Sequence, residues 1–164
     1  MAMAPDPHHT FENIDNMAAD IGVNTRGLSR VTADSFGLGR PMPDLLLGPS
    51  ARLFRQDAAL IAAIGSTAAL APISAFIDGD TVLSITPVAP VQVYHLAFSR
   101  HQIISANGLE IESYHPGSLH DMHLSGQMRA SFVAMFPQIK TLRDFGPLAH
   151  PRMSLDAALG VLAA

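Results

Sequence analysis

The chain has 164 residues, a net charge of −4 and no cysteine, which excludes disulfides, thiolate metal sites and cysteine nucleophiles. Hydrophobic residues make up 48% of the chain and charged residues only 15%, a composition that predicts one packed domain and excludes an intrinsically disordered chain. The ten Lys and Arg residues are scattered along the sequence, so no nucleic-acid partner is expected.

The N-terminal part, residues 1–26, is mostly polar and is predicted to be a flexible tail. It contains no basic region followed by an apolar run, so we recognise no signal peptide. The most apolar stretch, Ala58–Ile77, is interrupted by Gly65 and Pro72 and is interpreted as buried core, not as a membrane span. We therefore expect no membrane partner. The localisation stays unknown, with a soluble, cytoplasmic protein as the default.

Short strands separated by turn residues are predicted from residue 27 onward. Apolar or alternating runs with this pattern cover residues 28–33, 44–47, 52–54 and 81–86. The second and third runs flank Gly48-Pro49, which predicts a strand–turn–strand unit, and Asp78-Gly79-Asp80 predicts a turn before the fourth run. The first half of the chain is therefore expected to be a succession of strands and turns.

A β-meander is predicted in the middle of the chain. Residues 91–98 and 101–105 read as strands on either side of a turn at Ser99-Arg100. Asn107-Gly108 then predicts a tight hairpin, because both residues tolerate positive φ. Residues 109–114 alternate apolar and polar side chains, as a half-buried strand does.

Two helices are predicted near the C-terminus. Ser125 can cap a helix that runs to about Met135, with Met128, Phe132 and Met135 at helical spacing. Ser154 can cap a second helix through Leu162, and Leu155, Leu159 and Leu162 share one face of it. We interpret both apolar stripes as core-facing. The expected fold class is therefore mainly β with two C-terminal α-helices.

Residues 91–117 resemble the C-terminal strands of the bacterial Hedgehog/intein (Hint) domain. The shared pattern consists of a Tyr and a His at the strand start, an Arg-His pair, an Ala-x-Gly hairpin and a final Glu-Ser-aromatic, found here as Tyr94-His95, Arg100-His101, Ala106-Asn107-Gly108 and Glu112-Ser113-Tyr114. The chain departs from this pattern at Tyr94-His95, which are adjacent where the family has one residue between them. Residues 30–54 and 71–79 are similar to two upstream segments of that family. The resemblance extends over residues 27–150 and is most specific in the 91–117 block.

The resemblance implies an incomplete Hint-like β fold in three parts. These are a flexible tail at residues 1–26, a Hint-like β domain at 27–117 and a helical extension at 118–164. It also implies an autoprocessing reaction, in which an N-terminal Cys or Ser attacks the preceding peptide carbonyl. A Thr/Ser-x-x-His motif orients the amide and gives a proton to the leaving nitrogen.

The motif positions of this chain depart from the active pattern. Gly48 and Ala51 stand where the motif has its hydroxyl and its imidazole, and the nucleophile would lie upstream of the matched segments. Glu112-Ser113 stands where an intein has His-Asn, but Glu-Ser is common in bacterial Hint proteins of this type. The resemblance therefore implies a Hint-type protein that has lost self-cleavage and serves as an interaction or remnant module, with no catalytic residue or cofactor expected.

Two alternatives stay open. A half-domain completed in trans by another chain would remain an autoprocessing enzyme, with His101 replacing the missing imidazole. A metal-binding domain would use histidines, the weak candidates being His95, His101, His120 and His123. Neither pair alone makes a defined zinc site, so no metal is expected. Glu110 and Glu112 are interpreted as a solvated strand face.

A truncated Hint fold is expected to expose unpaired strand edges, which is a liability for a monomer. We therefore predict that the N-terminal segment, a C-terminal helix, self-association or a protein partner covers these edges. The partner prediction is a protein or a second copy that completes the β-sheet.

Overall fold

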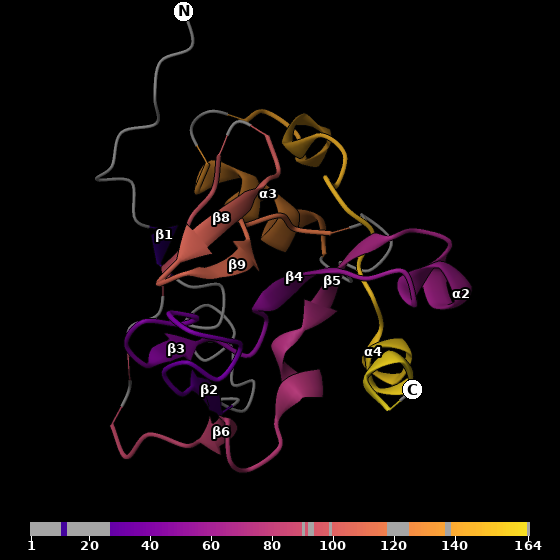
Figure 1. Cartoon of the computed structure of the whole chain (residues 1–164). Coiled ribbons are helices and arrows are strands. Elements are labelled where there is room, and N and C mark those ends of the chain that lie inside the picture. The colour runs from indigo at the N-terminus through magenta and orange to yellow at the C-terminus, as the bar shows by residue number, and fades with distance from the viewer. Residues whose placement is uncertain are drawn as a thin grey trace, which may run out of the picture.

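A computed structural model of the chain describes residues 11–12, 27–89, 91, 94–98, 100–117, 125–136 and 139–163 (Figure 1). Its strands are β1 (Phe11–Glu12), β2 (Leu28–Val31), β3 (Leu45–Leu47), β4 (Arg52–Gln56), β5 (Ala68–Pro72), β6 (Val82–Ile85), β7 (Tyr94–His95), β8 (Ile103–Ala106) and β9 (Leu109–Glu112). Its helices are α2 (Leu60–Ile64), α3 (Gly126–Ala134) and α4 (Leu155–Leu162), with single 3-10 turns η1 (Ile73–Phe76) and η2 (Leu142–Phe145). The mainly β fold class with two C-terminal α-helices is confirmed.

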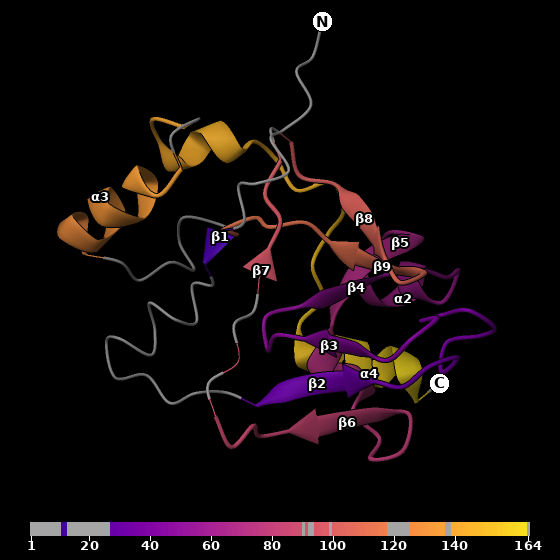
Figure 2. The ribbon, with the colours of Figure 1, turned by 90° about the vertical axis from the view of Figure 1, so that its left-hand side faces the viewer.

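The strands form two principal antiparallel sheets, which appear as two layers in Figure 2. One sheet has the order β3-β2-β6, and the other has the order β5-β4-β9-β8. The two sheets enclose a core of buried aliphatic side chains, namely Val31, Leu47, Leu53, Ile73, Val82 and Leu109. A third pairing joins β1 to β7.

The two short runs around Gly48-Pro49 are strands as predicted, but they belong to different sheets. β3 pairs with β2, whereas β4 pairs with β5 and β9. The turn between them therefore carries the chain from one layer to the other and does not close a hairpin. Sequence patterns report the strands and the turn, but not which partner each strand takes.

The hairpin at Asn107-Gly108 is confirmed. Both residues have positive φ, 49° and 90°, and the turn joins β8 to β9 in the register Ala106↔Leu109. A Cβ added to Gly108 would lie 2.2 Å from the carbonyl oxygen of Gly39, so only glycine permits this approach. The hairpin is thereby held against the 34–42 loop, where the Met42 N–H also donates to the Asn107 carbonyl at 2.9 Å.

The predicted meander is wrong for its first strand. β7 pairs with β1, and β8 pairs only with β9 among the described strands. The connection from β7 to β8 therefore crosses between sheets. Local alternation identified strand-forming residues, but pairing depends on long-range packing that alternation does not encode.

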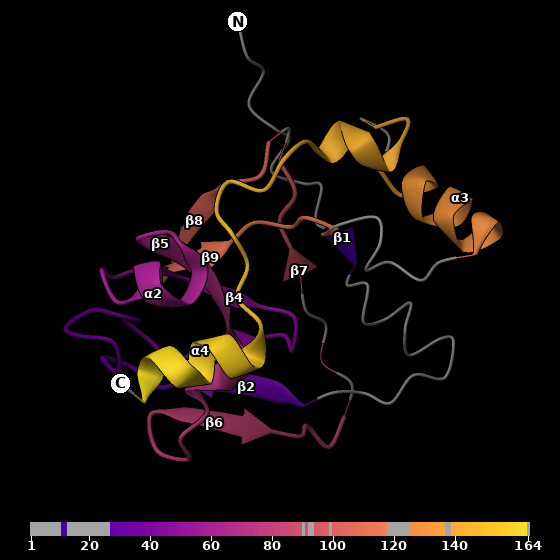
Figure 3. The same ribbon diagram turned by 90° about the vertical axis from the view of Figure 1, so that its right-hand side faces the viewer.

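Both C-terminal helices begin at the predicted caps. The Ser125 hydroxyl accepts from the Met128 N–H at 3.3 Å, and the Ser154 hydroxyl accepts from the Ala157 N–H at 3.2 Å. The interpretation of the α4 leucines as core is wrong, since the three, Leu155, Leu159 and Leu162, are between 43% and 47% exposed. The small Ala158 is the buried residue of α4, because the helix lies close against β5 and η1 (Figure 3).

Residues 151–153 of the C-terminal extension, the edge-covering segment, cover the edge of the sheet at β5. Leu70 of β5 donates its N–H to the Pro151 carbonyl and accepts from the Met153 N–H, both at 2.9 Å. This short parallel pairing occupies the outer side of β5, and Met153 enters the core beneath α4. The extension is thus packed into the β fold, as an edge-covering element should be.

Within the described residues, no helix is long and apolar enough to cross a membrane. The C-terminal part has a hydrophobic cluster of its own, which consists of Phe132, Phe136, Leu142 and Phe145 with Tyr114 packed against it. Tyr114 stacks on Phe136 with ring centroids 5.5 Å apart. This cluster ties α3 and η2 to the segment that follows β9.

Candidate functional site

A cleft of about 760 Å³ lies where the turn between β3 and β4 meets the end of β9 and the C-terminal segment. Of the five positions singled out by the Hint resemblance, Gly48, Ala51, Glu112 and Ser113 line it and His101 does not. The Gly48–Ala51 turn and the Glu112-Ser113 pair lie more than 60 positions apart in the sequence, and the layered fold brings them to one place. The cleft is therefore the candidate functional site.

The turn at residues 48–51 contributes backbone and a methyl group to the cleft. The Ala51 N–H donates to the Gly48 carbonyl at 3.1 Å, and the Ala51 carbonyl accepts from the Ile73 N–H at 2.9 Å. The Ala51 methyl packs against the aliphatic core between the sheets. Neither Gly48 nor Ala51 can donate or accept a proton through a side chain.

Glu112 is the charged centre of the site. Its side chain is only 6% exposed, and its Oε1 accepts from Arg152 Nε at 2.7 Å while Oε2 lies 3.8 Å from Arg52 Nε. Burial raises the pKa of this carboxyl, and the two guanidinium groups act in the opposite direction. The interpretation of Glu110 and Glu112 as one solvated face holds for the exposed Glu110 and is wrong for Glu112.

Two arginines reach Glu112 from different parts of the fold. Arg52 begins β4 and also donates from Nη1 to the Met153 carbonyl at 2.9 Å. Arg152 comes from the edge-covering segment and also donates from Nη2 to the His115 carbonyl at 2.8 Å. The guanidinium side chains are 25% and 23% exposed, so each faces the cleft in part.

His101 lies beneath the cleft and does not line it. Its side chain is fully buried, and its Nδ1 accepts from the Ala149 N–H at 2.8 Å. Nε2 lies 3.0 Å from Glu112 Oε1, but the ring N–H is not directed at that oxygen and makes no hydrogen bond with the described residues. Burial, with Arg152 nearby, lowers the pKa of His101 to about 4, so the ring is neutral at physiological pH.

His115 was not singled out by sequence reasoning, although it lines the cleft. Its Nδ1 accepts from the Gly117 N–H at 3.1 Å, which leaves the proton on Nε2 for the Gly146 carbonyl at 3.0 Å. Burial lowers its pKa, and its ring lies 5.1 Å from that of His101. Both nitrogens of His115 therefore serve structural hydrogen bonds.

Ser113 joins strands and is not exposed as a nucleophile. Its hydroxyl accepts from the Gln102 N–H at 3.0 Å, and its own N–H donates to the Gln102 carbonyl at 2.9 Å. The residue is 2% exposed. Its hydroxyl thus completes the pairing beyond the end of β9.

The histidine-based metal site receives no geometric support. His95 lies on β7 and His101 precedes β8, and these strands belong to different sheets. His120 and His123 fall outside the described residues. Over the part of the chain that the structure describes, no group of three or more potential ligands is arranged to hold a metal ion.

Sequence reasoning missed Arg52 and Arg152 as site residues. Arg52 adjoins the 48–51 turn, and the need of a buried Glu112 for a counter-charge could have drawn attention to it. Arg152 lies 40 residues beyond Glu112 on a segment without a motif, so no local signal points to it. Only the pairing of residues 151–153 with β5 brings it to the cleft.

Comparison with known proteins identifies the family of the chain. No curated protein and no solved structure matches the chain. Residues 19–118 match the family described as the Hint domain. Since this match covers more than half of the sequence and includes the cleft residues from Gly48 to Ser113, the chain belongs to the Hint domain family.

Proposed function

We propose that this Hint-type domain has lost autoprocessing and acts as a folded binding module whose cleft holds an extended segment of a protein partner. The observation that carries the proposal is the presence of Gly48 and Ala51 in the cleft, where active relatives need a hydroxyl and an imidazole. Acyl transfer requires a group that gives a proton to the leaving nitrogen, and neither residue has one.

His101 does not replace the missing imidazole. It lies outside the cleft lining, and its Nδ1 is occupied by the Ala149 N–H. Its pKa of about 4 leaves it without the second proton that a general acid would give up at neutral pH. This geometry also counts against a half-domain completed in trans, for which His101 was the proposed substitute.

The strands around the cleft favour binding of an extended chain. β3 is the outer strand of its described sheet, and β8 is the outer strand of the other. Residues of both strands, including Leu46 and Ile104, line the cleft. An added peptide strand can pair with such an edge through main-chain hydrogen bonds and place alternate side chains in the cleft.

Intact-mass spectrometry of the purified full chain, incubated with and without hydroxylamine or a thiol, tests the loss of processing. These nucleophiles cleave the ester or thioester that an active Hint site would form. We expect the chain to keep its mass of 17.4 kDa under every condition. Cleavage at one defined bond would contradict the proposal. Ser50 carries an exposed hydroxyl in the turn. Because we expect this hydroxyl to form no ester, a Ser50→Ala variant should likewise keep its mass under every condition.

A further inference from the structure

The cleft contains an unbalanced pair of positive charges. Among the described residues that line it, Arg52 and Arg152 carry guanidinium groups, and Glu112 carries the one carboxylate. His115 adds no charge at neutral pH, because burial lowers its pKa. The lining therefore has a local charge of about +1 from two cations and one anion, although the whole chain is acidic.

Both guanidinium groups have donors left for a ligand. Arg52 uses Nη1 for the Met153 carbonyl, and Arg152 uses Nε and Nη2 for Glu112 and the His115 carbonyl. Within the described part of the chain, Nη2 of Arg52 and Nη1 of Arg152 make no hydrogen bond. A planar guanidinium with free N–H groups suits a carboxylate, which it can bind through paired hydrogen bonds.

The walls beside the arginines are apolar. Leu45 and Leu47 of β3, Ile111 of β9 and Leu155 of α4 line the same cleft. Leu155 is also the first of the three exposed leucines of α4. These leucines do not take part in the packing of α4 against β5. The cleft thus combines two guanidinium groups, apolar side chains and the edges of the outer strands β3 and β8.

We propose that the occupant of the cleft is an acidic peptide segment in extended conformation, with an Asp or Glu side chain directed at Arg52 and Arg152 and apolar side chains at the alternate positions. This inference rests on the proposed function, since it requires a cleft used for binding. Side chains two residues apart on a strand point the same way, so the segment presents its carboxylate and its neighbouring inward side chains to one wall. The added carboxylate balances the second guanidinium.

Fluorescence anisotropy with the full chain tests the proposal directly. The probe is a labelled octapeptide, acetylated and amidated at its ends, with one central glutamate among valine and threonine. A second probe has glutamine in place of the glutamate. We expect the glutamate peptide to bind about tenfold more tightly, the difference that one favourable charge pair of about 1.4 kcal/mol produces.

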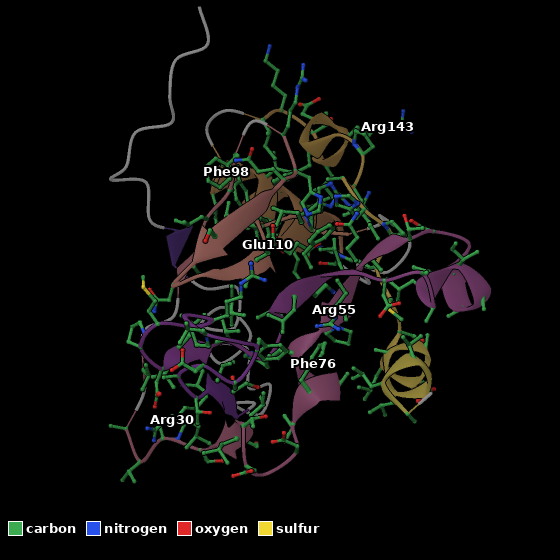
Figure 4. The ribbon with its side chains drawn as sticks, in the orientation of Figure 1. Arg30, Arg55, Phe76, Phe98, Glu110 and Arg143 are labelled. Carbon is green, nitrogen blue, oxygen red and sulfur yellow. The ribbon has the colours of Figure 1, made fainter. Side chains whose placement is uncertain are left out.

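Variants of the protein assign that difference to the cleft. Arg52→Gln should remove most of the preference for glutamate. Arg143→Gln should leave it unchanged, because Arg143 is exposed on η2 (Figure 4) and is not among the residues that line the cleft. Glu112→Gln removes the competing carboxylate and should tighten binding of the glutamate peptide. A merely structural role of Glu112 would weaken binding of both peptides instead, and far-ultraviolet circular dichroism checks that each variant is folded.

Several outcomes would overturn the proposal. Equal binding of the two peptides would show that the carboxylate is not recognised. An effect of Arg143→Gln as large as that of Arg52→Gln would show that the preference does not arise in the cleft. Displacement by inorganic phosphate at the same concentration as the peptide would indicate a simple anion site. A glutamine peptide with a free C-terminus that matches the glutamate peptide would indicate terminal-carboxylate capture. If these results occur while the intact mass stays constant, the acidic-peptide inference fails and the loss of processing stands.

Discussion

Arg152 donates a hydrogen bond of 2.7 Å from Nε to Oε1 of Glu112, a residue 40 positions earlier in the chain. Glu112 ends β9 within the Hint-matched region, whereas Arg152 lies in the C-terminal extension beyond residue 118. The contact therefore makes the extension part of the cleft. It also supplies the counter-charge without which a carboxylate that is 6% exposed would be costly to bury.

Loss of this contact should destabilise the fold. Arg152→Met leaves Glu112 with only the more distant Arg52, and we expect the free energy of unfolding to fall by about 2–4 kcal/mol, as for a buried pair that loses one partner. Urea denaturation followed by circular dichroism measures the change. Adding Glu112→Gln to Arg152→Met should recover part of the loss. The account is contradicted if Arg152→Met costs no more than the surface control Arg143→Met.

Removal of the edge-covering segment should be more severe than any point substitution. A chain that ends at residue 150 lacks both hydrogen bonds to Leu70 and the buried Met153 and Ala158. We expect this chain to lose cooperative thermal unfolding, because the outer side of β5 and the core under α4 become exposed. A chain that lacks only the last two residues is the control. Cooperative melting of the shorter chain would show that the extension is a separate unit.

Substitution of glycine by alanine should have opposite effects on the free energy of unfolding at Gly108 and at Gly160. Gly108→Ala places a Cβ 2.2 Å from the Gly39 carbonyl oxygen at a φ of 90°, so we expect a loss of at least about 2 kcal/mol. Gly160→Ala meets no atom within 4 Å and lies inside α4, so we expect a gain of about 0.5–1 kcal/mol. Thermal melts of the two variants decide the matter. Effects of the same sign would show that one of these backbone environments is wrong.

Stability should decline as the pH falls below neutral, because the folded protein holds His101 neutral. The unfolded chain takes up a proton near pH 6.5, while the folded chain does so only near pH 4, so protonation favours unfolding between these values. We expect a loss of about 1–2 kcal/mol from pH 7 to pH 5. His115 acts in the same direction, whereas the raised pKa of Glu112 opposes it.

Urea titrations at the two pH values, with His101→Gln as the comparison, measure this effect. The variant should show a smaller difference between pH 7 and pH 5, since one proton-binding group is gone from the unfolded state. A nuclear magnetic resonance titration of His101 in the folded protein should give a pKa far below 6.5. A pKa above 6.5 would mean that Glu112 stabilises the charged ring and would reverse the sign of the prediction.

Local sequence signals predicted the elements that turns and caps define, but neither α2 nor β5 was predicted within the apolar stretch 58–77. Asn107-Gly108 identified its hairpin because positive φ is a property of those two residues, and Ser125 and Ser154 identified helix starts because capping is local. The pairing of β7 with β1, in contrast, depends on contacts between distant residues. The α4 leucines show the same limit, since Ala158 faces the sheet on account of close packing that a hydrophobic pattern cannot weigh.

The candidate site was predictable only in part. The Hint resemblance identified Gly48, Ala51 and the Glu112-Ser113 pair, and the structure brings these positions to one cleft. It did not identify Arg152, which reaches Glu112 only after residues 151–153 pair with β5. Charge compensation in a buried site is a property of the folded chain, so a partner outside the family motif carries no signal of its own.

The most direct test of the account is the intact mass of the full chain after prolonged incubation at neutral pH with hydroxylamine. We predict one species at 17.4 kDa, because neither Gly48 nor Ala51 offers the groups that acyl transfer requires. Two fragments whose masses sum to that of the chain plus the added nucleophile would contradict the central claim.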